Sequence, residues 1–228
     1  MTSRPTNSKN LEQYLVGLTG NICSGKSKVA EYFRQSGAYV IDMDNLVHEL
    51  YKKNILLKYE LCKKFGIKIL NKKIEIDRKK LGCIVLSDKP KMKELEGIVW
   101  PYALKESKKR IKGKKGIMLF EAAMLYESGF DKKMDKNILV MSDEEQQLKR
   151  LMARNGLSKE EALKRISIQM SPLDKVFKSD YIIFNNGSFD ELKENVNQTW
   201  KHLHEDYEKS IYLLENSKAY KSVSNSRC

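Results

Sequence analysis

The sequence predicts an α/β protein with a doubly wound parallel sheet, on three observations. Short apolar runs alternate along the chain with longer stretches whose apolar residues recur at helical spacing. A glycine-containing segment joins the first apolar run to the first helical stretch, and acidic residues stand at the carboxyl ends of two runs. Because sheets of this kind bind ligands beyond the carboxyl ends of their strands, we expect the functional site at that edge.

The first predicted elements lie near the amino terminus. We expect a strand over residues 14–19, a glycine loop, and a helix over 26–37 with Val29, Ala30 and Phe33 on one face. A second strand is expected over 38–42. Further along, the pattern predicts strands over 116–121, 136–141 and 180–184 and helices over 143–156 and 158–170.

Between residues 44 and 113 the pattern changes to a lysine-rich, largely helical stretch. Pro90 and Pro101 are expected to break its helices. We interpret it as an insertion over the strand ends. The polar segments 1–13 and 213–228 are expected to be flexible.

Composition excludes several classes of protein. The 228 residues are 41% hydrophobic and 32% charged, and no apolar run approaches the ~18 residues of a membrane-spanning helix. The amino-terminal segment has no apolar core of a signal peptide, so we expect a cytoplasmic protein without membrane contact. The four cysteines lie far apart without a C-x-x-C pair, which argues against a zinc site and a disulfide framework.

The charge of +13 has two interpretations, attraction for nucleic acid or a basic surface around a site for small polyanions. The lysines are scattered in pairs, and no nucleic-acid-binding motif is readable. We therefore expect no nucleic-acid partner, and we expect a monomer.

The segment GNICSGKS, Gly20 to Ser27, matches the spacing of a phosphate-binding loop. A strand before it and a helix after it provide the required context, because backbone N–H groups and a helix N-terminus must both face the phosphates. Lys26 would reach the β- and γ-phosphates, and the Ser27 hydroxyl would bind Mg²⁺. Gly20 and Gly25 would let the backbone approach the anion.

Carboxylates follow two of the strands. Asp42 and Asp44, two residues apart, could point the same way where the second strand ends. A phosphoryl acceptor hydroxyl needs a carboxylate to orient it or accept its proton, so either could serve, and one of them could merely cap the following helix. Glu121 resembles a carboxylate that steadies Mg²⁺ through water, and a helix-capping role is its alternative.

Three of only eight arginines fall within sixteen positions of helical sequence: Arg150, Arg154 and Arg165. Arg150 and Arg154 are one turn apart on one face. They are suited to binding phosphoryl oxygens with paired hydrogen bonds and neutralising charge during transfer. The alternative is a solvated, salt-bridged helix face.

The chain resembles dephospho-coenzyme A kinases from about Leu15 to Thr199. Seven stretches match in order: VGLTGNICSGKSKVAEYF, GAYVIDMDNLVHELY, IDRKKLGCIVLSD, LEGIVWP, LFEAAMLYESG, QLKRLMARNGLSKEEALKRISIQ and SDYIIFNNGS. These kinases use ATP to phosphorylate the ribose 3′-hydroxyl of dephospho-CoA. The resemblance implies the same reaction here, with ATP and Mg²⁺ as cofactors and dephospho-CoA as the small-molecule partner.

The resemblance also implies a domain layout of the P-loop NTPase type. It assigns residues 14–44, 114–145 and 170–200 to a nucleotide-binding core, 45–113 to a helical substrate domain and 146–169 to a lid.

The resemblance assigns the site residues as well. It selects Asp44 over Asp42 as the base and places the adenine of ATP near residues 185–188. The catalytic set is then Asp44, Lys26, Arg150, Arg154 and Arg165. The ATP-binding set is Asn21, Ile22, Cys23, Ser24, Gly25, Lys26, Ser27, Lys28, Asn186 and Gly187. The substrate-binding set is Asp44, Arg78, Leu81, Trp100 and Glu121, and the metal-binding set is Ser27 and Glu121.

The sequence departs from the family pattern at four positions. Asn21 and Cys23 replace usual glycines, Ala123 a usual proline, and Trp100 a usual histidine. Asparagine tolerates left-handed backbone angles, whereas cysteine adopts them poorly. Trp100 could contact the substrate or fill the interior of the helical domain.

Two other functions stay open. One is a kinase for another small acceptor, such as a nucleoside monophosphate, which would share the loop and lid. The other is a non-catalytic nucleotide-binding protein, which would not need Asp44 together with the arginines.

Overall fold

The computed structural model describes residues 12–86, 88–167 and 169–225, with side chains as far as residue 216. The chain divides into two compact units. One comprises the chain up to Val40 and again from Gly113 onward, and the other is Ile41–Lys112. The second unit is thus a single insertion in the sequence of the first.

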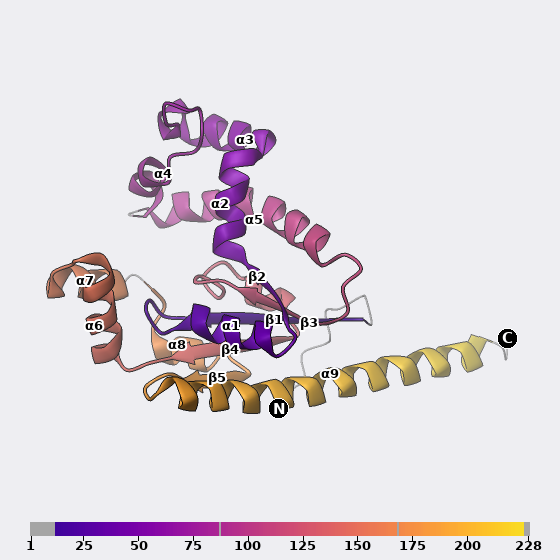
Figure 1. Cartoon of the computed structure of the whole chain (residues 1–228). Coiled ribbons are helices and arrows are strands. Elements are labelled where there is room, and N and C mark those ends of the chain that lie inside the picture. Colours follow the sequence, from indigo (N-terminus) through magenta and orange to yellow (C-terminus); the bar gives the residue numbers. More distant parts are fainter. Residues whose placement is uncertain (1–11, 87, 168, 226–228) are drawn as a thin grey trace. The chain divides into compact units, whose positions relative to one another are not determined.

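The described residues form a five-stranded sheet in the order β2-β3-β1-β4-β5 (Figure 1). Strand β1 pairs in parallel with β3 and β4, and β4 pairs in parallel with β5. Helices connect most of these strands, so the predicted doubly wound α/β class is confirmed. The strands are β1 (Gln13–Gly20), β2 (Tyr39–Asp42), β3 (Gly116–Glu121), β4 (Lys136–Met141) and β5 (Tyr181–Phe184).

One face of the sheet packs against α1 (Lys26–Gln35) and α9 (Phe189–Asn225). The predicted apolar face of α1 is confirmed, because its buried residues are Val29, Ala30 and Phe33. They pack with alternate residues of the strands, which point to the same face. The strand and α9 residues of this core are Tyr14, Val16, Leu18, Ile117, Leu119, Ile138, Val140, Ile183, Leu192, Val196 and Leu203.

The segment after β3 covers the opposite face. A Cβ atom on Gly17 would lie 2.7 Å from Leu125 Cδ2, so β1 approaches this segment too closely for any side chain. Phe120 meets Phe130 edge to face, with ring centroids 5.7 Å apart. Phe130 begins the short 3-10 helix η2 (Phe130–Lys133).

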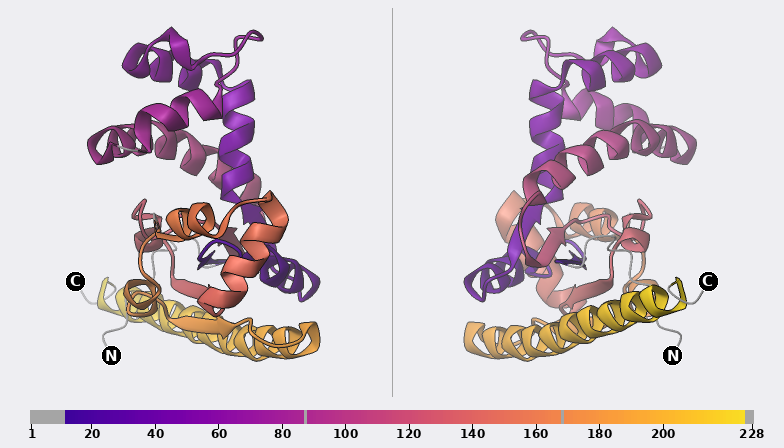
Figure 2. Two further views of the ribbon diagram at one scale, coloured as in Figure 1. Left: turned by 90° about the vertical axis from the view of Figure 1, so that its left-hand side faces the viewer. Right: turned by 90° about the vertical axis from the view of Figure 1, so that its right-hand side faces the viewer.

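Two helices after β4 form a hairpin, α6 (Glu144–Asn155) and α7 (Lys159–Ser167). Gly156, at φ 63°, ends α6 in the left-handed conformation that suits glycine. The hairpin lies beyond the carboxyl end of β4, and α8 (Pro172–Val176) leads back to β5 (Figures 1 and 2). Helix α7 is shorter than the predicted 158–170.

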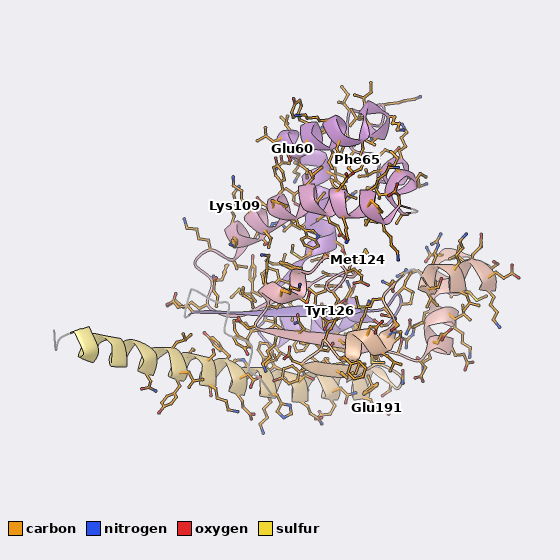
Figure 3. The ribbon with its side chains drawn as sticks, turned by 180° about the vertical axis from the view of Figure 1, so that it is seen from behind. Glu60, Phe65, Lys109, Met124, Tyr126 and Glu191 are labelled. Carbon is orange, nitrogen blue, oxygen red and sulfur yellow. The ribbon has the colours of Figure 1, made fainter. Side chains whose placement is uncertain are left out.

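Helix α9 begins with a reciprocal cap. The Ser188 backbone N–H donates to Glu191 Oε2 at 3.3 Å, and the Glu191 N–H donates to Ser188 Oγ at 3.2 Å (Figure 3). The helix continues to Asn225, so residues 213–225, expected to be flexible, are helical. Of the other residues expected to be flexible, Gln13 begins β1, whereas residues 1–11 and 226–228 lie outside the described part of the chain.

The unit Ile41–Lys112 is helical, as its sequence predicts. Asp42, Asn54, Asp77 and Asp88 each accept a backbone N–H at the start of a helix. The elements are α2 (Met43–Lys53), α3 (Ile55–Phe65), η1 (Ile67–Ile69), α4 (Arg78–Val85) and α5 (Lys89–Ile111).

This helical unit has its own core and its own polar cross-links. Leu46, Leu57 and Leu61 are fully buried. The Tyr102 hydroxyl of α5 donates to Glu60 of α3 at 2.8 Å, and Glu60 is labelled in Figure 3. These contacts hold α5 against α3.

The predicted breaks at Pro90 and Pro101 need one correction. Pro90 lies in the first turn of α5, where a missing N–H costs nothing. Pro101 lies inside α5, which continues through it to Ile111, so the prediction of a helix break there is wrong. Packing of Val99, Ala103 and Ile111 in the core of this unit outweighs the lost hydrogen bond.

No helix in the described part of the chain is long and apolar enough to cross a membrane.

Candidate active site

The glycine loop between β1 and α1 depends on two glycines. A Cβ atom on Gly20 would lie 2.7 Å from the Val140 carbonyl oxygen, which no side chain tolerates. Gly25 has φ 91°, and a Cβ atom there would collide with the Asn185 side chain. The loop therefore lies close against the ends of β4 and β5.

Cys23 takes the left-handed backbone conformation in this loop, with φ 59°. Among the described non-glycine residues only Cys23 and Ile74 have positive φ, so Asn21 does not use the left-handed tolerance that asparagine offers. The conformation turns the chain so that the Ser24 N–H donates to the Asn21 carbonyl at 3.0 Å.

Lys26 and Ser27 meet one carboxylate oxygen. The Ser27 hydroxyl donates to Glu121 Oε1 at 2.7 Å, and Lys26 Nζ lies 3.6 Å from the same oxygen. Lys26 and Glu121 side chains are only 14% and 7% exposed. Glu121 ends β3 beside Leu18 of β1, so the sheet register brings this carboxylate to the start of α1.

The loop lines a cavity of about 510 Å³. All of Gly20 to Lys28 contributes to the lining, which includes the predicted ATP-binding residues from Asn21 to Lys28. The other lining residues are Ala123, Arg150, Arg154 and Gln169. A concave site beside a helix N-terminus, with lysine and arginines, suits a polyphosphate.

The three predicted arginines are placed differently. Arg150 of α6 donates to the Cys23 and Asn185 carbonyls, each at 3.4 Å, and to Gln146 Oε1 at 2.7 Å. Arg154, one turn later, is exposed and lines the cavity. Arg165 is exposed on α7 and is not among the lining residues. The chain reverses after Gly156, which separates Arg165 from the face shared by the other two.

Three other predicted ATP-binding residues make local contacts. Lys28 pairs with Glu31 at 3.0 Å and lies over the Tyr32 ring. Both polar atoms of the Asn186 side chain bond to Asp143, at 2.9 and 2.8 Å. The place of a Gly187 Cβ atom is taken by the Glu191 carboxylate. Asn186 and Gly187 lie between β5 and α9 and are absent from the cavity lining.

Two residues that contact the loop were absent from the predicted site sets, although Asn185 lay within the segment 185–188 expected near the adenine. Buried Asn185 donates from Nδ2 to the Ser24 carbonyl at 2.8 Å, and Gln169 Oε1 accepts the Ile22 N–H at 2.7 Å. Asn185 follows the carboxyl end of β5, and ligands of such sheets bind beyond the carboxyl ends of the strands, so its position was a signal for the site. Gln169 lies between α7 and α8 and carries no sequence signal.

Asp42 and Asp44, expected together on the second strand, lie in different elements, because the strand ends between them. Strand β2 stops at Asp42, whose side chain accepts the Asn45 N–H at 2.8 Å as the N-cap of α2. Asp44 lies in the first turn of α2 and is exposed, so the two residues do not alternate on one strand. The capping role considered for one of them falls to Asp42.

The remaining predicted substrate residues belong to the unit Ile41–Lys112. Arg78 begins α4 and is exposed, Leu81 is 3% exposed within the core of this unit, and Trp100 is half-buried on α5. Burial lowers the pKa of His48, and the charges of Lys52 and Arg78 lower it further. Arg78 is thus near enough to His48 for its charge to act on the imidazole, as are the opposing charges of Glu49 and Glu75.

The oxygen atoms of Ser27 and Glu121 fit a Mg²⁺ ion. Both are the hard ligands that this ion prefers, and the serine proton points at the carboxylate, which leaves the hydroxyl lone pairs for a metal. No group of three or more His, Cys, Asp or Glu side chains within the described residues could hold a metal ion.

The chain is similar to known proteins over most of its length. The family model described as dephospho-CoA kinase matches residues 14–191. A dephospho-CoA kinase from Aquifex aeolicus is 41% identical over 193 residues, covering 84% of this chain and 98% of the relative. One from Fusobacterium nucleatum is 38% identical over 185 residues, covering 80% and 94%.

The fold is also similar to that of solved structures. The crystal structure of TT1252 from Thermus thermophilus has a TM-score of 0.73 at 30% identity, covering 84% of this chain and 98% of its own. A dephospho-CoA kinase from Campylobacter jejuni has a TM-score of 0.51 at 28% identity, covering 84% and 97%. A shikimate kinase from Bacteroides thetaiotaomicron, at 14% identity and a TM-score of 0.52 with 84% and 98% covered, shares the fold alone.

Proposed function

The chain belongs to the dephospho-CoA kinase family, and we propose that it transfers the γ-phosphoryl group of ATP to the ribose 3′-hydroxyl of dephospho-CoA. The products are coenzyme A and ADP. The observation that carries the proposal is that Lys26 and Ser27, which line the cavity together with Arg150 and Arg154, meet at one oxygen of Glu121. A phosphate loop with a carboxylate at this point is equipped for phosphoryl transfer and not only for anion binding.

The nucleotide phosphates bind in the loop. Backbone N–H groups at the start of α1 and the Lys26 ammonium stabilise the negative charge of the β- and γ-phosphates. Arg150 and Arg154 add guanidinium groups from the facing side of the cavity. Their charge is worth most when it meets the charge that develops during transfer. Arg165 stays a candidate that lid movement would have to bring in.

The acceptor is activated by a carboxylate. In our proposal Asp44 accepts the proton of the 3′-hydroxyl while the new bond from that oxygen to the γ-phosphorus forms. The bond from the γ-phosphorus to the oxygen bridging it to the β-phosphate breaks, and ADP leaves with the electron pair. Asp44 is chosen because the family resemblance selects it over Asp42, which accepts the Asn45 N–H as the N-cap of α2. Arg78, Leu81 and Trp100 are the proposed contacts in the substrate domain, 45–113.

Mg²⁺ is part of the proposal. Ser27 and Glu121 would hold the ion, directly or through water, and it would neutralise charge on the nucleotide phosphates.

The test is an acceptor panel. The purified protein is incubated with Mg-ATP and dephospho-CoA, AMP or shikimate, and ADP release and product mass are measured, with Lys26→Ala as the blank. Dephospho-CoA should gain one phosphoryl group and the other acceptors none. Transfer to AMP alone would favour the nucleoside monophosphate kinase, and ATP binding without transfer would favour the non-catalytic nucleotide-binding protein.

A further inference from the structure

Gln169 lines the cavity and contacts the phosphate loop, and the proposed function gives it no role. Its side-chain oxygen accepts the Ile22 N–H of the phosphate loop at 2.7 Å, although 147 positions separate the two residues. The same side chain lines the cavity together with Lys26, Arg150 and Arg154. A side-chain amide has a donor as well as an acceptor, and among the described residues only the acceptor has a partner.

We propose that Gln169 is a further catalytic residue, whose Nε2 donates a hydrogen bond to the γ-phosphoryl group, and that partly buried Glu127 positions it. This inference rests on the proposed function, since it assumes that ATP occupies the loop. It adds a neutral donor to the cationic groups of the site.

The orientation of the amide follows from hydrogen bonding. A backbone N–H can only donate, so the Gln169 atom that meets Ile22 must be the oxygen. The NH₂ group is therefore directed away from Ile22. None of the described residues accepts a hydrogen bond from it, and the residue lies on the cavity wall. Donors aimed into a phosphate cavity stabilise charge without needing to reorient.

The backbone beside Gln169 is held by Glu127. Glu127 Oε1 accepts the Met170 N–H at 3.2 Å and lies 3.3 Å from Lys175 Nζ. The Lys175 side chain is fully buried and the Glu127 side chain 15% exposed. The segment from the lid to α8 is thereby anchored to the segment that follows β3.

The ion pair of Glu127 and Lys175 also interacts electrostatically with Lys26 of the phosphate loop. Burial lowers the pKa of the Lys175 ammonium, Glu127 opposes this effect, and the charge of Lys26 lowers the pKa further. Lys175 is therefore near enough to the phosphate-binding lysine to feel its charge. A buried ion pair is an expensive way to gain stability, so its value here is a fixed geometry.

A competing explanation is that the Gln169 amide only occupies the phosphate-binding N–H of Ile22 while no nucleotide is bound. On that explanation an incoming phosphate displaces the amide and takes the Ile22 N–H itself. Removing the amide would then strengthen ATP binding. In our proposal its removal weakens the interaction with the γ-phosphoryl group.

The decisive variant is Gln169→Glu. A glutamate can still accept the Ile22 N–H, so the melting temperature should stay near that of the parent. It replaces the donor by a negatively charged acceptor, so we expect kcat to fall by roughly 10²-fold, the usual effect of losing one such donor. ATP affinity should fall more than ADP affinity, because only ATP carries the γ-phosphoryl group. Gln198→Glu on exposed α9 makes the same charge change and should behave as the parent.

Three results would overturn the inference. They are parental kcat and KM in Gln169→Glu, equal losses of ATP and ADP affinity, and tighter ATP binding in Gln169→Met. The nucleotide affinities need no acceptor, so they test Gln169 even if the parent does not phosphorylate dephospho-CoA. An inactive parent that still binds ATP would contradict the proposed function instead.

Glu127 is tested as a positioning residue by a double-mutant cycle. Glu127→Gln keeps an acceptor for Met170 but lacks the charge that pairs with Lys175. If Glu127 acts through Gln169, adding Glu127→Gln to Gln169→Met should lower kcat no further than Gln169→Met alone. Independent, multiplicative losses in kcat would show that Glu127 does not act through Gln169.

Discussion

Cys23 shows how one backbone angle can matter to a binding loop. Its φ of 59° places a side-chain residue where glycine is preferred, at a cost of about 1–2 kcal/mol. Its carbonyl accepts from Arg150 at 3.4 Å, so the loop conformation and the arginine are coupled. The residue type at this position therefore sets how much strain the loop stores.

Cys23→Gly is expected to raise the free energy of unfolding by about 0.5–1 kcal/mol. Relief of the left-handed strain exceeds the extra chain entropy that glycine loses on folding. Urea unfolding curves of the two proteins measure the difference. Cys23→Val should lower stability, because a β-branched residue tolerates positive φ least. A glycine variant less stable than the parent would contradict the claim that Cys23 strains the backbone of the loop.

Asp44 and Asp42 should separate catalysis from stability. Asp44→Asn should lower kcat by roughly 10²-fold, because an amide cannot accept the hydroxyl proton. Asp42→Ala should lower the free energy of unfolding by about 1 kcal/mol, since the N-cap of α2 loses its acceptor.

Steady-state rates of ADP release and urea curves measure both effects. Asp42→Asn serves as the control, because asparagine caps helices well. A large fall in kcat for Asp42→Asn with normal kcat for Asp44→Asn would move the base to Asp42.

Among the helices, α5 contains a proline in its interior and lacks one backbone hydrogen bond there. Pro101 has no N–H to donate to the Gly97 carbonyl, and proline inside a helix costs about 3 kcal/mol. The helix nonetheless spans Lys89–Ile111, because its buried residues hold it on both sides of the proline. Packing decides the structure where local preference points the other way.

Pro101→Ala is therefore expected to stabilise the helical unit by about 1 kcal/mol or more. Alanine restores the missing hydrogen bond, and the exposed position of Pro101 leaves room for the change. Thermal unfolding followed by circular dichroism measures it. A lower melting temperature would mean that the proline ring contributes to packing or to a required bend.

The whole molecule should lose stability at alkaline pH. Burial raises the pKa of Tyr51 to about 12, and burial also raises the pKa of Tyr14 and Tyr181. The folded state keeps the phenol protons that the unfolded chain releases above pH ~10. This stability is fully present below pH ~10 and is lost as pH rises toward the folded-state pKa.

Tyr51→Phe should flatten the alkaline part of the stability curve. The free energy of unfolding of the parent should fall between pH ~10 and ~12, by up to about 1.4 kcal/mol for each unit by which a tyrosine pKa is raised. The variant has one titrating phenol fewer and should lose less. Urea unfolding at a series of pH values tests this. Equal slopes for both proteins would mean that Tyr51 titrates alike in the folded and unfolded states.

The sequence by itself determined the features that depend on neighbours within a few residues. Strand, glycine loop and helix follow from local periodicity, and with them the placement of Lys26 and Ser27 at the start of α1. The strands over 116–121 and 136–141 were predicted to the residue. Arg150 and Arg154 share a face because helical spacing requires it.

Only the tertiary structure decided which distant residues meet. Gln169 reaches Ile22, Asn185 reaches Ser24, and Glu127 joins Met170 to Lys175. The strand order makes these contacts possible, because it places β4 beside β1 and β5 beside β4. Local pattern records which side of a strand or helix is apolar, but it holds no information on which elements become neighbours. That choice depends on packing of the whole chain, which also carried α5 through Pro101.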